Sequence, residues 1–438
     1  MNAGIATPPD RRSLRRAIAA TTIGNALEFF DFTVYGFLAV IIGKLFFPTV
    51  DSNSQLLLAV ASFGVGFVMR PFGGILIGAH ADRAGRKKAM TLTISLMAVG
   101  CAMIAFAPTY AAIGIAAPLL IVAARLIQGL SAGGEVGAST TLLVELATPA
   151  NRGYMASWQF ASQGLGVLLG AAMVAGLTCS LTTQAMASWG WRLPFVAGLA
   201  IAPVGVYIRR HLEESLQVAP AGATRKHESS LRILCKEHGR TVMAAILSLV
   251  GTTSAAYVVT FYMPTYAVRE LGLSPAAALS GAALTGLISF SFAPLVGKLS
   301  DAVGRKPLIL CGRIALAALI YPGFRWLNAS PDPIVLHLVL AAFTLVLVFQ
   351  SVPSITMLPE MFPKAVRASG MSLVYGIGVA LFGGLAPLIS TWLVQFTGNK
   401  LAPAWYLVFV TLASLPGLLL LQDQTGRNID AKGPGTPR

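Results

Sequence analysis

Long apolar segments recur along the whole chain, and a short polar stretch separates each from the next. The hydrocarbon core of a bilayer is about 30 Å thick, so a spanning helix needs about 20 mainly apolar residues. The chain is 55% hydrophobic and 11% charged, whereas about 25% of the residues of soluble domains are charged. The sequence therefore predicts an all-α polytopic membrane protein.

The apolar pattern predicts twelve transmembrane helices. The first apolar segment is too long for a cleavable signal and lacks a small-residue cleavage site, so we expect it to remain as the first helix. The predicted spans lie near residues 17–43, 55–80, 89–107, 112–145, 153–179, 190–209, 241–267, 275–297, 308–326, 333–358, 368–396 and 403–422.

The distribution of lysine and arginine predicts the orientation in the membrane, because cytoplasmic loops are enriched in these residues. If the N-terminus lies inside, the outer segments hold only Lys44, Arg192, Arg269, Arg325 and Lys400, and most other basic residues fall on inner segments. Both termini are therefore predicted to be cytoplasmic. The same distribution accounts for the net charge of +15, so we expect no nucleic-acid partner.

No pattern typical of a metal site or of catalysis is present. The cysteines, Cys101, Cys179, Cys235 and Cys311, show no CxxC or Cys/His spacing, which argues against a disulfide framework or a zinc site. The chain has no HExxH or GxSxG motif, and its histidines fall in loops or at span edges. We therefore expect neither catalytic residues, nor a metal, nor a cofactor, and the chain is not predicted to be an enzyme.

Two internal repeats divide the chain into halves. GAHADRAGRK at 78–87 matches GKLSDAVGRK at 297–306, and the spacing of Glu145 to Arg152 recurs between Glu360 and Arg367. The predicted parts are a basic N-terminal tail (1–16), an N-terminal six-helix bundle (17–209), a cytoplasmic central loop (210–240), a C-terminal six-helix bundle (241–422) and a cytoplasmic C-terminal tail (423–438).

Several strings resemble one known family. EFFDFTVYG (28–36), MRPFGGILIGAHADRAGRKK (69–88), RLIQGLSAGGEVG (125–137) and ELATPANRGYMASWQ (145–159) resemble the metabolite–proton symporter branch of the major facilitator superfamily. FYMPTYAVRELGLS (261–274) and SWQFASQ (157–163) are most similar to the citrate and tricarballylate symporters of that branch. The resemblance implies two pseudo-symmetric six-helix bundles that transport substrate by alternating access.

The repeated inner loop predicts a cytoplasmic gate. Gly78 and Gly85 permit a tight turn, and Asp82 can accept hydrogen bonds at a helix N-terminus of the other bundle. Arg83 and Arg86 can contact inner carboxylates. The resemblance implies that such contacts close the cytoplasmic side, although the basic residues can also serve only to set the topology. The predicted gate residues are Gly78, Asp82, Arg83, Gly85, Arg86, Glu145, Arg152, Asp301, Arg305, Glu360 and Arg367.

Ionisable side chains inside a bilayer are costly and are functional by default. Glu28 and Asp31 share one face of the first span, and the depth of Asp31 matches that of Arg125 on the fourth. The C-terminal half offers only neutral polar groups near its span centres, since Arg313 is expected at an inner edge. The buried ionisable residues of the N-terminal half are Glu28, Asp31, Arg70, Arg125 and Glu135.

These residue types suit recognition of a carboxylate and coupling to protons. The planar fork of arginine binds both oxygens of a carboxylate. We predict that Glu28 or Asp31 alternates between a proton and the Arg125 guanidinium, with Glu135 as a further proton-coupling residue; structural salt bridges are the alternative. The predicted substrate-binding residues are Asn25, Tyr35, Arg70, Arg125, Gln128, Trp158, Gln159, Gln163, Tyr257, Gln350 and Tyr375.

The resemblance favours a monomeric, proton-driven symporter of the bacterial inner membrane that imports citrate or tricarballylate. The alternatives are another substrate of the branch, such as α-ketoglutarate, shikimate or betaine, and a passive facilitator or channel. Osmolyte carriers of this branch tend to carry a long C-terminal heptad helix. The tail here is short and rich in Gly and Pro, which counts against that substrate class.

Overall fold

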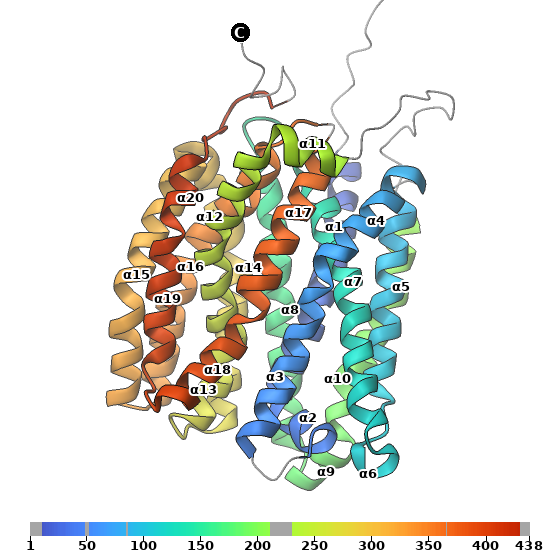
Figure 1. Cartoon of the computed structure of the whole chain (residues 1–438), viewed down its shortest axis with the longest axis vertical. Coiled ribbons are helices and arrows are strands. Elements are labelled where there is room, and N and C mark those ends of the chain that lie inside the picture. Colours follow the sequence, from blue (N-terminus) through green and yellow to red (C-terminus); the bar gives the residue numbers. More distant parts are fainter. Residues whose placement is uncertain (1–10, 49–51, 85, 211–229, 365, 430–438) are drawn as a thin grey trace, which may run out of the picture.

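The computed structural model describes residues 11–48, 52–84, 86–210, 230–364 and 366–429. Within these ranges every regular element is a helix, and the long helices run side by side (Figure 1). α8, α14 and α15 meet the polar inner loops at the same end of the molecule as α11. The charge pattern predicts this end to be cytoplasmic, and we call it the inner end.

The N-terminal bundle is built from the first half of the chain. Its elements are α1 (Arg11–Phe37), α2 (Ala39–Phe46), α3 (Ser52–Val68), α4 (Arg70–Ala84), α5 (Arg86–Ala105), α6 (Tyr110–Ile113), α7 (Ala116–Glu145), α8 (Arg152–Ser180), α9 (Thr183–Ser188), the 3₁₀ turn η1 (Gly190–Arg192) and α10 (Leu193–Arg210).

The C-terminal bundle follows the central segment. Its elements are α11 (Ser230–Glu237), α12 (Gly239–Tyr257), the π-helical turn η2 (Val258–Tyr262), α13 (Met263–Arg269), α14 (Pro275–Val303), α15 (Arg305–Ala329), α16 (Pro333–Glu360), α17 (Arg367–Gly378), the π-helical turn η3 (Val379–Gly384), α18 (Ala386–Thr397), α19 (Ala402–Ala413) and α20 (Leu415–Leu420).

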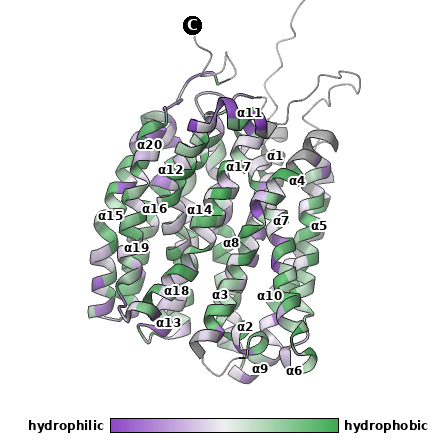
Figure 2. Cartoon of the chain, viewed as in Figure 1, coloured by the Kyte–Doolittle hydropathy of each residue, from purple (hydrophilic) through white to green (hydrophobic). Residues whose placement is uncertain are grey.

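Each predicted span coincides with one helix or with a run of consecutive helices. Nine helices of the described residues are long and apolar enough to cross a membrane, or ten if the bent pair α1–α2 counts as one span. The remaining two spans correspond to α5, whose apolar part is shorter, and to α10. Figure 2 shows hydrophobic residues along the helices and hydrophilic ones gathered at α11. Large apolar side chains such as Phe396 and Phe409 are exposed, as lipid-facing residues are.

Two local features differ from the sequence-based expectation. The first span is not one straight helix, because the chain bends by 66° between α1 and α2. The predicted central loop contains a short amphipathic helix, α11, with apolar side chains on one face and polar side chains on the other. The π-helical turns η2 and η3 both belong to the C-terminal bundle, and such turns often mark functional sites.

Glycines bring the two bundles into close contact where α8 packs along α14. A Cβ atom on Gly164 would lie 2.6 Å from the Phe290 nitrogen, and one on Gly297 would lie 2.6 Å from the Gly153 carbonyl oxygen. Small residues allow membrane helices to approach in this way. The contact fixes α8 against α14 and so positions the polar side chains that both helices direct toward the centre.

Candidate functional site

Asp31 of α1 and Arg125 of α7, which the sequence places at matching depths in the membrane, form an ion pair in the structure. Arg125 Nη1 donates to Asp31 Oδ2 at 2.9 Å and to Gln128 Oε1 at 2.8 Å. The guanidinium carbon lies 3.5 Å from the centre of the Tyr35 ring, and all four side chains are buried. Arg125 is thus enclosed by its own bundle and has charge, hydrogen-bond and cation–π partners there.

A cysteine completes this cluster. Cys101 on α5 donates its thiol hydrogen to Asp31 Oδ1 at 3.3 Å, and Gln128 Nε2 donates to the Cys101 sulfur at 3.5 Å. Both oxygens of the Asp31 carboxylate are therefore engaged. The role of Cys101 could not be predicted from the sequence, because a lone cysteine in an apolar span carries no signal that distinguishes it from a packing residue.

Glu28 forms a second ion pair with a different arginine. Arg70 Nη2 donates to Glu28 Oε1 at 2.7 Å, and the Arg70 guanidinium lies 4.3 Å from the centre of the Phe67 ring. Residues three apart differ by about 60° around a helix, so Glu28 faces α4 while Asp31 faces α7. In this conformation Glu28 therefore contacts Arg70 and not Arg125.

Glu135 lies on α7 and faces α5. Its carboxylate accepts a hydrogen bond from Thr93 at 3.0 Å, and the side chain is buried. This contact joins the two helices inside the N-terminal bundle. Glu135 also interacts electrostatically with Glu28, so the two buried acids belong to one charged region of the bundle.

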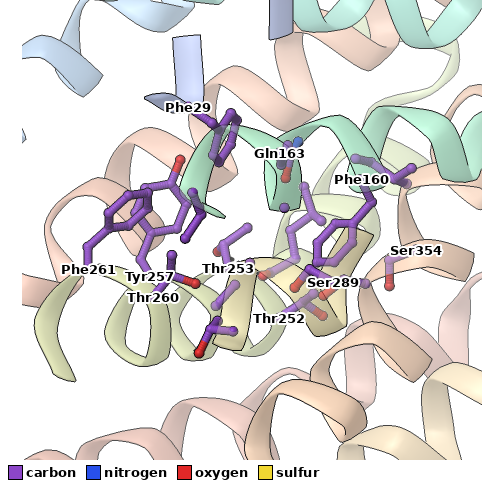
Figure 3. Close-up of a pocket in the computed structure, with 18 of the residues that line it drawn as sticks. Phe29, Phe160, Gln163, Thr252, Thr253, Tyr257, Thr260, Phe261, Ser289 and Ser354 are labelled. Atoms are coloured by element: carbon purple, nitrogen blue, oxygen red, sulfur yellow. Dashed lines mark hydrogen bonds between the residues drawn. The ribbon is translucent and has the colours of Figure 1, made fainter. Parts of the chain in front are cut away.

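A cavity lies between the bundles, and both of them contribute residues to its walls. Gln163 points into it from α8, and Thr252, Thr253 and Tyr257 face it from α12 (Figure 3). The walls carry many hydroxyl groups among apolar side chains, which suits a small polar ligand. The lining residues are Phe29, Phe160, Gln163, Gly164, Val167, Leu249, Thr252, Thr253, Ala256, Tyr257, Thr260, Phe261, Thr285, Gly286, Ser289, Ser351, Ser354, Ile355 and Tyr375.

Of the predicted substrate-binding residues, Gln163, Tyr257 and Tyr375 line the cavity. Arg70 lies just behind this wall, because it interacts electrostatically with both tyrosines and stacks on Phe67, whose ring lies 5.2 Å from that of Tyr257. Arg70 Nε and Nη1, the Tyr257 hydroxyl and Gln163 Nε2 make no hydrogen bond of good geometry among the described residues, although Arg70 interacts with Tyr257 and Gln163 with Tyr375. Buried polar atoms normally have partners, so these donors are suited to a ligand or to water.

The other predicted substrate-binding residues do not line the cavity. Asn25 joins α1 to α8 by donating to the Gln159 carbonyl at 2.8 Å and to Ser162 Oγ at 2.7 Å. Ser139 donates to Gln159 Oε1 at 3.4 Å. Trp158 packs edge-on against Tyr154. Four members of the predicted set therefore hold helices of the N-terminal bundle together in this conformation: Asn25, Tyr35, Gln128 and Gln159.

Gln350 and Arg313 are buried in the C-terminal bundle. Neither side-chain polar atom of Gln350 has a partner among the described residues. The expectation that Arg313 sits at an inner edge is wrong. It lies eight residues beyond Arg305, the first residue of α15, which is about 12 Å along the helix, and its side chain is fully buried. The C-terminal half therefore does hold a charge within its spans.

The inner end is closed by ion pairs between the bundles. Arg152 of α8 donates to Glu360 of α16 at 3.0 Å, and Arg305 Nη2 donates to the same carboxylate oxygen at 3.3 Å. The Arg367 and Glu145 side chains lie 3.8 Å apart and also join the two bundles.

Asp301 caps the start of α8. Its carboxylate accepts hydrogen bonds from the backbone nitrogens of Gly153 at 2.7 Å and Tyr154 at 2.9 Å. The first N–H groups of a helix lack partners within the helix, so a carboxylate from the other bundle satisfies them. The sequence predicts the same capping contact for Asp82, which matches Asp301 in the repeat. The structure does not describe the contacts of five predicted gate residues: Gly78, Asp82, Arg83, Gly85 and Arg86.

The segment after α20 packs over the inner end. Asp423 accepts a hydrogen bond from the Lys306 backbone nitrogen at 2.9 Å, and Thr425 Oγ1 accepts one from the Arg305 nitrogen at 3.1 Å. Arg152 Nη2 donates to the Arg427 carbonyl oxygen. Burial opposes ionisation of Asp423, but hydrogen bonds from Thr425 and Lys306 outweigh it and hold the pKa of this carboxyl below its usual value.

Known proteins share the sequence pattern and the architecture of this chain. The sequence pattern of the Major Facilitator Superfamily matches residues 21–373 and 282–431. A citrate-proton symporter of Salmonella typhi is 39% identical over 410 residues, which cover 92% of this chain and 93% of that protein. An alpha-ketoglutarate permease of Escherichia coli K12 is 36% identical over 417 residues, covering 95% of each chain. A proline/betaine transporter of Salmonella typhimurium is 32% identical over 443 residues, covering 98% of this chain and 88% of that protein.

The fold has a close counterpart among solved structures. A proton:xylose symporter of the same superfamily, bound to a bromodeoxyglucose, has a TM-score of 0.79 at 20% identity and covers 96% of this chain and 98% of its own. This likeness confirms the predicted all-α fold. These relatives are transporters, so the chain is related to transport proteins and not to enzymes. The chain belongs to the Major Facilitator Superfamily.

Proposed function

We propose that the chain is a proton-coupled symporter that imports a small organic anion by alternating access, and that the anion is a tricarboxylate such as citrate. The observation that carries the proposal is the buried Glu28–Arg70 pair beside the central cavity. It places an exchangeable acid and a carboxylate-binding group in contact with one another. The similarity to a citrate-proton symporter supports the choice of substrate.

Arg70 has the geometry to exchange one carboxylate for another. Glu28 occupies Nη2, while the rest of the guanidinium faces the neutral Tyr257 hydroxyl and has no second carboxylate among the described residues. A carboxylate binds both of its oxygens on an arginine edge that includes Nη2, so a substrate that reaches past Tyr257 and Tyr375 gains this two-fold contact only when Glu28 leaves Nη2. Protonation of Glu28 removes the competing negative charge, so the anion and the proton bind together.

The Asp31–Arg125 pair supplies a second acid that can exchange its proton. Because Arg125 is enclosed by Asp31, Gln128 and Tyr35, it does not line the cavity in this conformation. That Arg125 holds the substrate therefore remains a prediction that needs a conformational change. Replacing each arginine with lysine keeps the charge and removes the fork. We expect Arg70→Lys to weaken substrate binding more than Arg125→Lys does, which equilibrium binding of labelled citrate would measure.

Alternating access requires the inner end to open after the outer end has closed. The ion pairs of Glu360 with Arg152 and of Glu145 with Arg367 join the bundles at the inner end, so they must separate for release. We propose that the proton and the anion leave on this side and that the Glu28–Arg70 pair then forms again. No cofactor is required, because the proton gradient drives accumulation.

The experiment that tests the proposal is uptake of labelled citrate into proteoliposomes with an imposed pH gradient. We expect accumulation when the outside is acidic, and loss of accumulation when a protonophore dissipates the gradient. Equilibration to equal concentrations, with no dependence on the gradient, would instead identify a passive facilitator. Absence of citrate uptake under all conditions would contradict the proposed substrate.

A dicarboxylate is the second candidate, because the alpha-ketoglutarate permease covers the chain as fully as the citrate symporter does. Competition by tricarballylate, α-ketoglutarate, shikimate and betaine in the same uptake assay separates the candidates. Strong competition by tricarballylate alone supports a tricarboxylate. Competition by betaine would favour the zwitterion class to which the proline/betaine transporter belongs.

We also propose that the protein acts as a monomer in the bacterial inner membrane with both termini in the cytoplasm. The bias of lysine and arginine toward the inner loops supports this orientation. Labelling of single cysteines at Lys298 and Lys400 in intact cells tests it, since these exposed residues lie near opposite ends of the described helices. An impermeant thiol reagent should reach position 400 only.

A further inference from the structure

Arg313 is a buried cation that the proposed mechanism does not use. Its Nη1 donates to the Ser414 carbonyl oxygen at 3.0 Å. Its Nη2 donates to the Ser248 carbonyl oxygen at 2.7 Å, to Ser248 Oγ at 3.3 Å and to Thr252 Oγ1 at 3.1 Å. Every one of these acceptors is neutral, and in the described part of the chain no carboxylate forms an ion pair with Arg313.

A buried charge without a counter-charge is costly inside a membrane protein. The other buried arginines of the described helices all have a carboxylate partner; they are Arg70, Arg125, Arg152, Arg305 and Arg367. Arg313 is the exception, and hydrogen bonds to neutral groups offset only part of its desolvation. An anion that binds nearby would supply the missing charge.

The nearest such place is the central cavity, because Thr252 lines it and accepts a hydrogen bond from Arg313. A threonine hydroxyl that accepts a hydrogen bond still has one hydrogen to donate. Donation from a charged group polarises the hydroxyl and strengthens the hydrogen bond that it gives in turn. Ser351, on α16, also lines the cavity, and its hydroxyl has no partner among the described residues.

We propose that Arg313, acting through Thr252, gives the C-terminal bundle an anion-binding position that receives a second carboxylate of the substrate. This inference rests on the proposed function, since it assumes an anionic substrate. Arg70 lies beside Tyr257, five residues after Thr252 on the same helix, which is about 7.5 Å along its axis. A molecule with several carboxylates can interact with both positively charged regions, whereas a monocarboxylate can interact with only one. Arg313 is thus a positioning residue that selects for multiply charged anions.

The test compares full-length variants in proteoliposomes, with citrate, α-ketoglutarate and lactate as substrates or competitors. We expect Arg313→Gln to raise the citrate KM at least about tenfold, which is the effect of one unit charge acting over several ångströms in a partly polar interior. The lactate inhibition constant should change much less. Arg313→Lys keeps the charge and should stay closer to the wild type than Arg313→Gln does.

Thr252 provides the variant that leaves the arginine in place. Thr252→Val removes the hydroxyl that lies between Arg313 and the cavity but preserves shape, so the citrate KM should rise several-fold, whereas Thr252→Ser should bind citrate almost as the wild type does. Arg313→Gln can fail to fold, which size exclusion and thermal unfolding in detergent would show. In that case the comparison of Thr252→Val with Thr252→Ser decides whether Arg313 acts on the substrate. An unchanged citrate KM in Thr252→Val would then overturn the inference.

Two further outcomes also overturn it. If Arg313→Gln folds and its citrate KM equals that of the wild type, the charge does not act on the substrate, and the proposed function stands. If the apparent affinities for citrate and lactate fall by the same factor, Arg313 supports packing only. A wild-type protein that transports none of the organic anions refutes the proposed function and this inference together, before any variant is compared.

Discussion

Replacing Glu360 with glutamine removes the carboxylate on which two arginines of the inner end converge. Arg152 and Arg305 donate to the same Glu360 oxygen at 3.0 and 3.3 Å, and all three side chains are buried. Only the Arg152 contact joins the two bundles. In a state with the inner end open, water would solvate Arg152, so the substitution destabilises the closed state selectively.

The size of the effect follows from the cost of an unpaired buried charge. Removing one partner of a buried ion pair costs about 3–5 kcal/mol. Arg152 keeps its bond to the Arg427 carbonyl and Arg305 keeps Asp301, so we take the lower value. About 3 kcal/mol corresponds to a shift of more than about 100-fold in the equilibrium between the closed and open inner end.

Distances between spin labels measure this shift. Thr148, before α8, and Lys364, before α17, are exposed at the inner end and belong to different bundles. Labels on cysteines at these two positions report the separation of the bundles, after the exposed Cys179, Cys235 and Cys311 have been replaced. We expect a longer distance to become the main population in Glu360→Gln.

The matched control is Glu237→Gln on α11, which removes an exposed carboxylate near the same end. It should leave the distance distribution unchanged. If folded Glu360→Gln protein gives the same distribution as the wild type, the ion pairs do not hold the inner end closed, and the reasoning fails.

Three further substitutions test the site and the packing. Asp31→Asn should abolish proton-driven accumulation yet retain exchange of labelled for unlabelled substrate; full accumulation would show that Asp31 carries no essential proton. Cys101→Ala removes the thiol donor to Asp31 and should lower uptake about two- to fivefold, as expected for loss of a weak hydrogen bond, while Cys101→Ser should recover most of the loss. Gly164→Ala should lower the thermal unfolding temperature, because its Cβ would meet α14 at 2.6 Å. Gly176→Ala on the same helix meets nothing within 4 Å and should leave that temperature unchanged.

The sequence alone predicts those features that depend on one-dimensional patterns. Apolar length places each predicted span on a helix or on a run of helices, and nine or ten of the described helices have the length and hydropathy that a bilayer requires. Helical periodicity and depth place Asp31 opposite Arg125, and the structure has them 2.9 Å apart. The repeat of Glu145 and Arg152 at Glu360 and Arg367 identifies residues that meet across the inner end.

Contacts that depend on the rotation and packing of helices cannot be predicted in the same way. Glu28 and Asp31 share a broad face of α1, yet about 60° of rotation between them directs Glu28 to Arg70. Arg313 was placed at an inner edge because the apolar pattern sets the start of its span only within several residues. The Gly-Arg pair that begins α15 marks that start more closely and places Arg313 well inside.

The pattern of satisfied and unsatisfied groups indicates how substrate binding can drive the conformational change. At the inner end, Glu360 and Asp301 accept hydrogen bonds from the opposite bundle, so the charges there are matched in this conformation. In the cavity, by contrast, the polar groups of Gln163, Tyr257 and Ser351 come from both bundles and have no carboxylate among their described ion-pair partners. A ligand shifts a conformational equilibrium only by binding one state better than another. Donors from both bundles can close on one anion only when the bundles rotate about it, so the contacts that the substrate gains in that rotation must offset the ion pairs lost at the inner end.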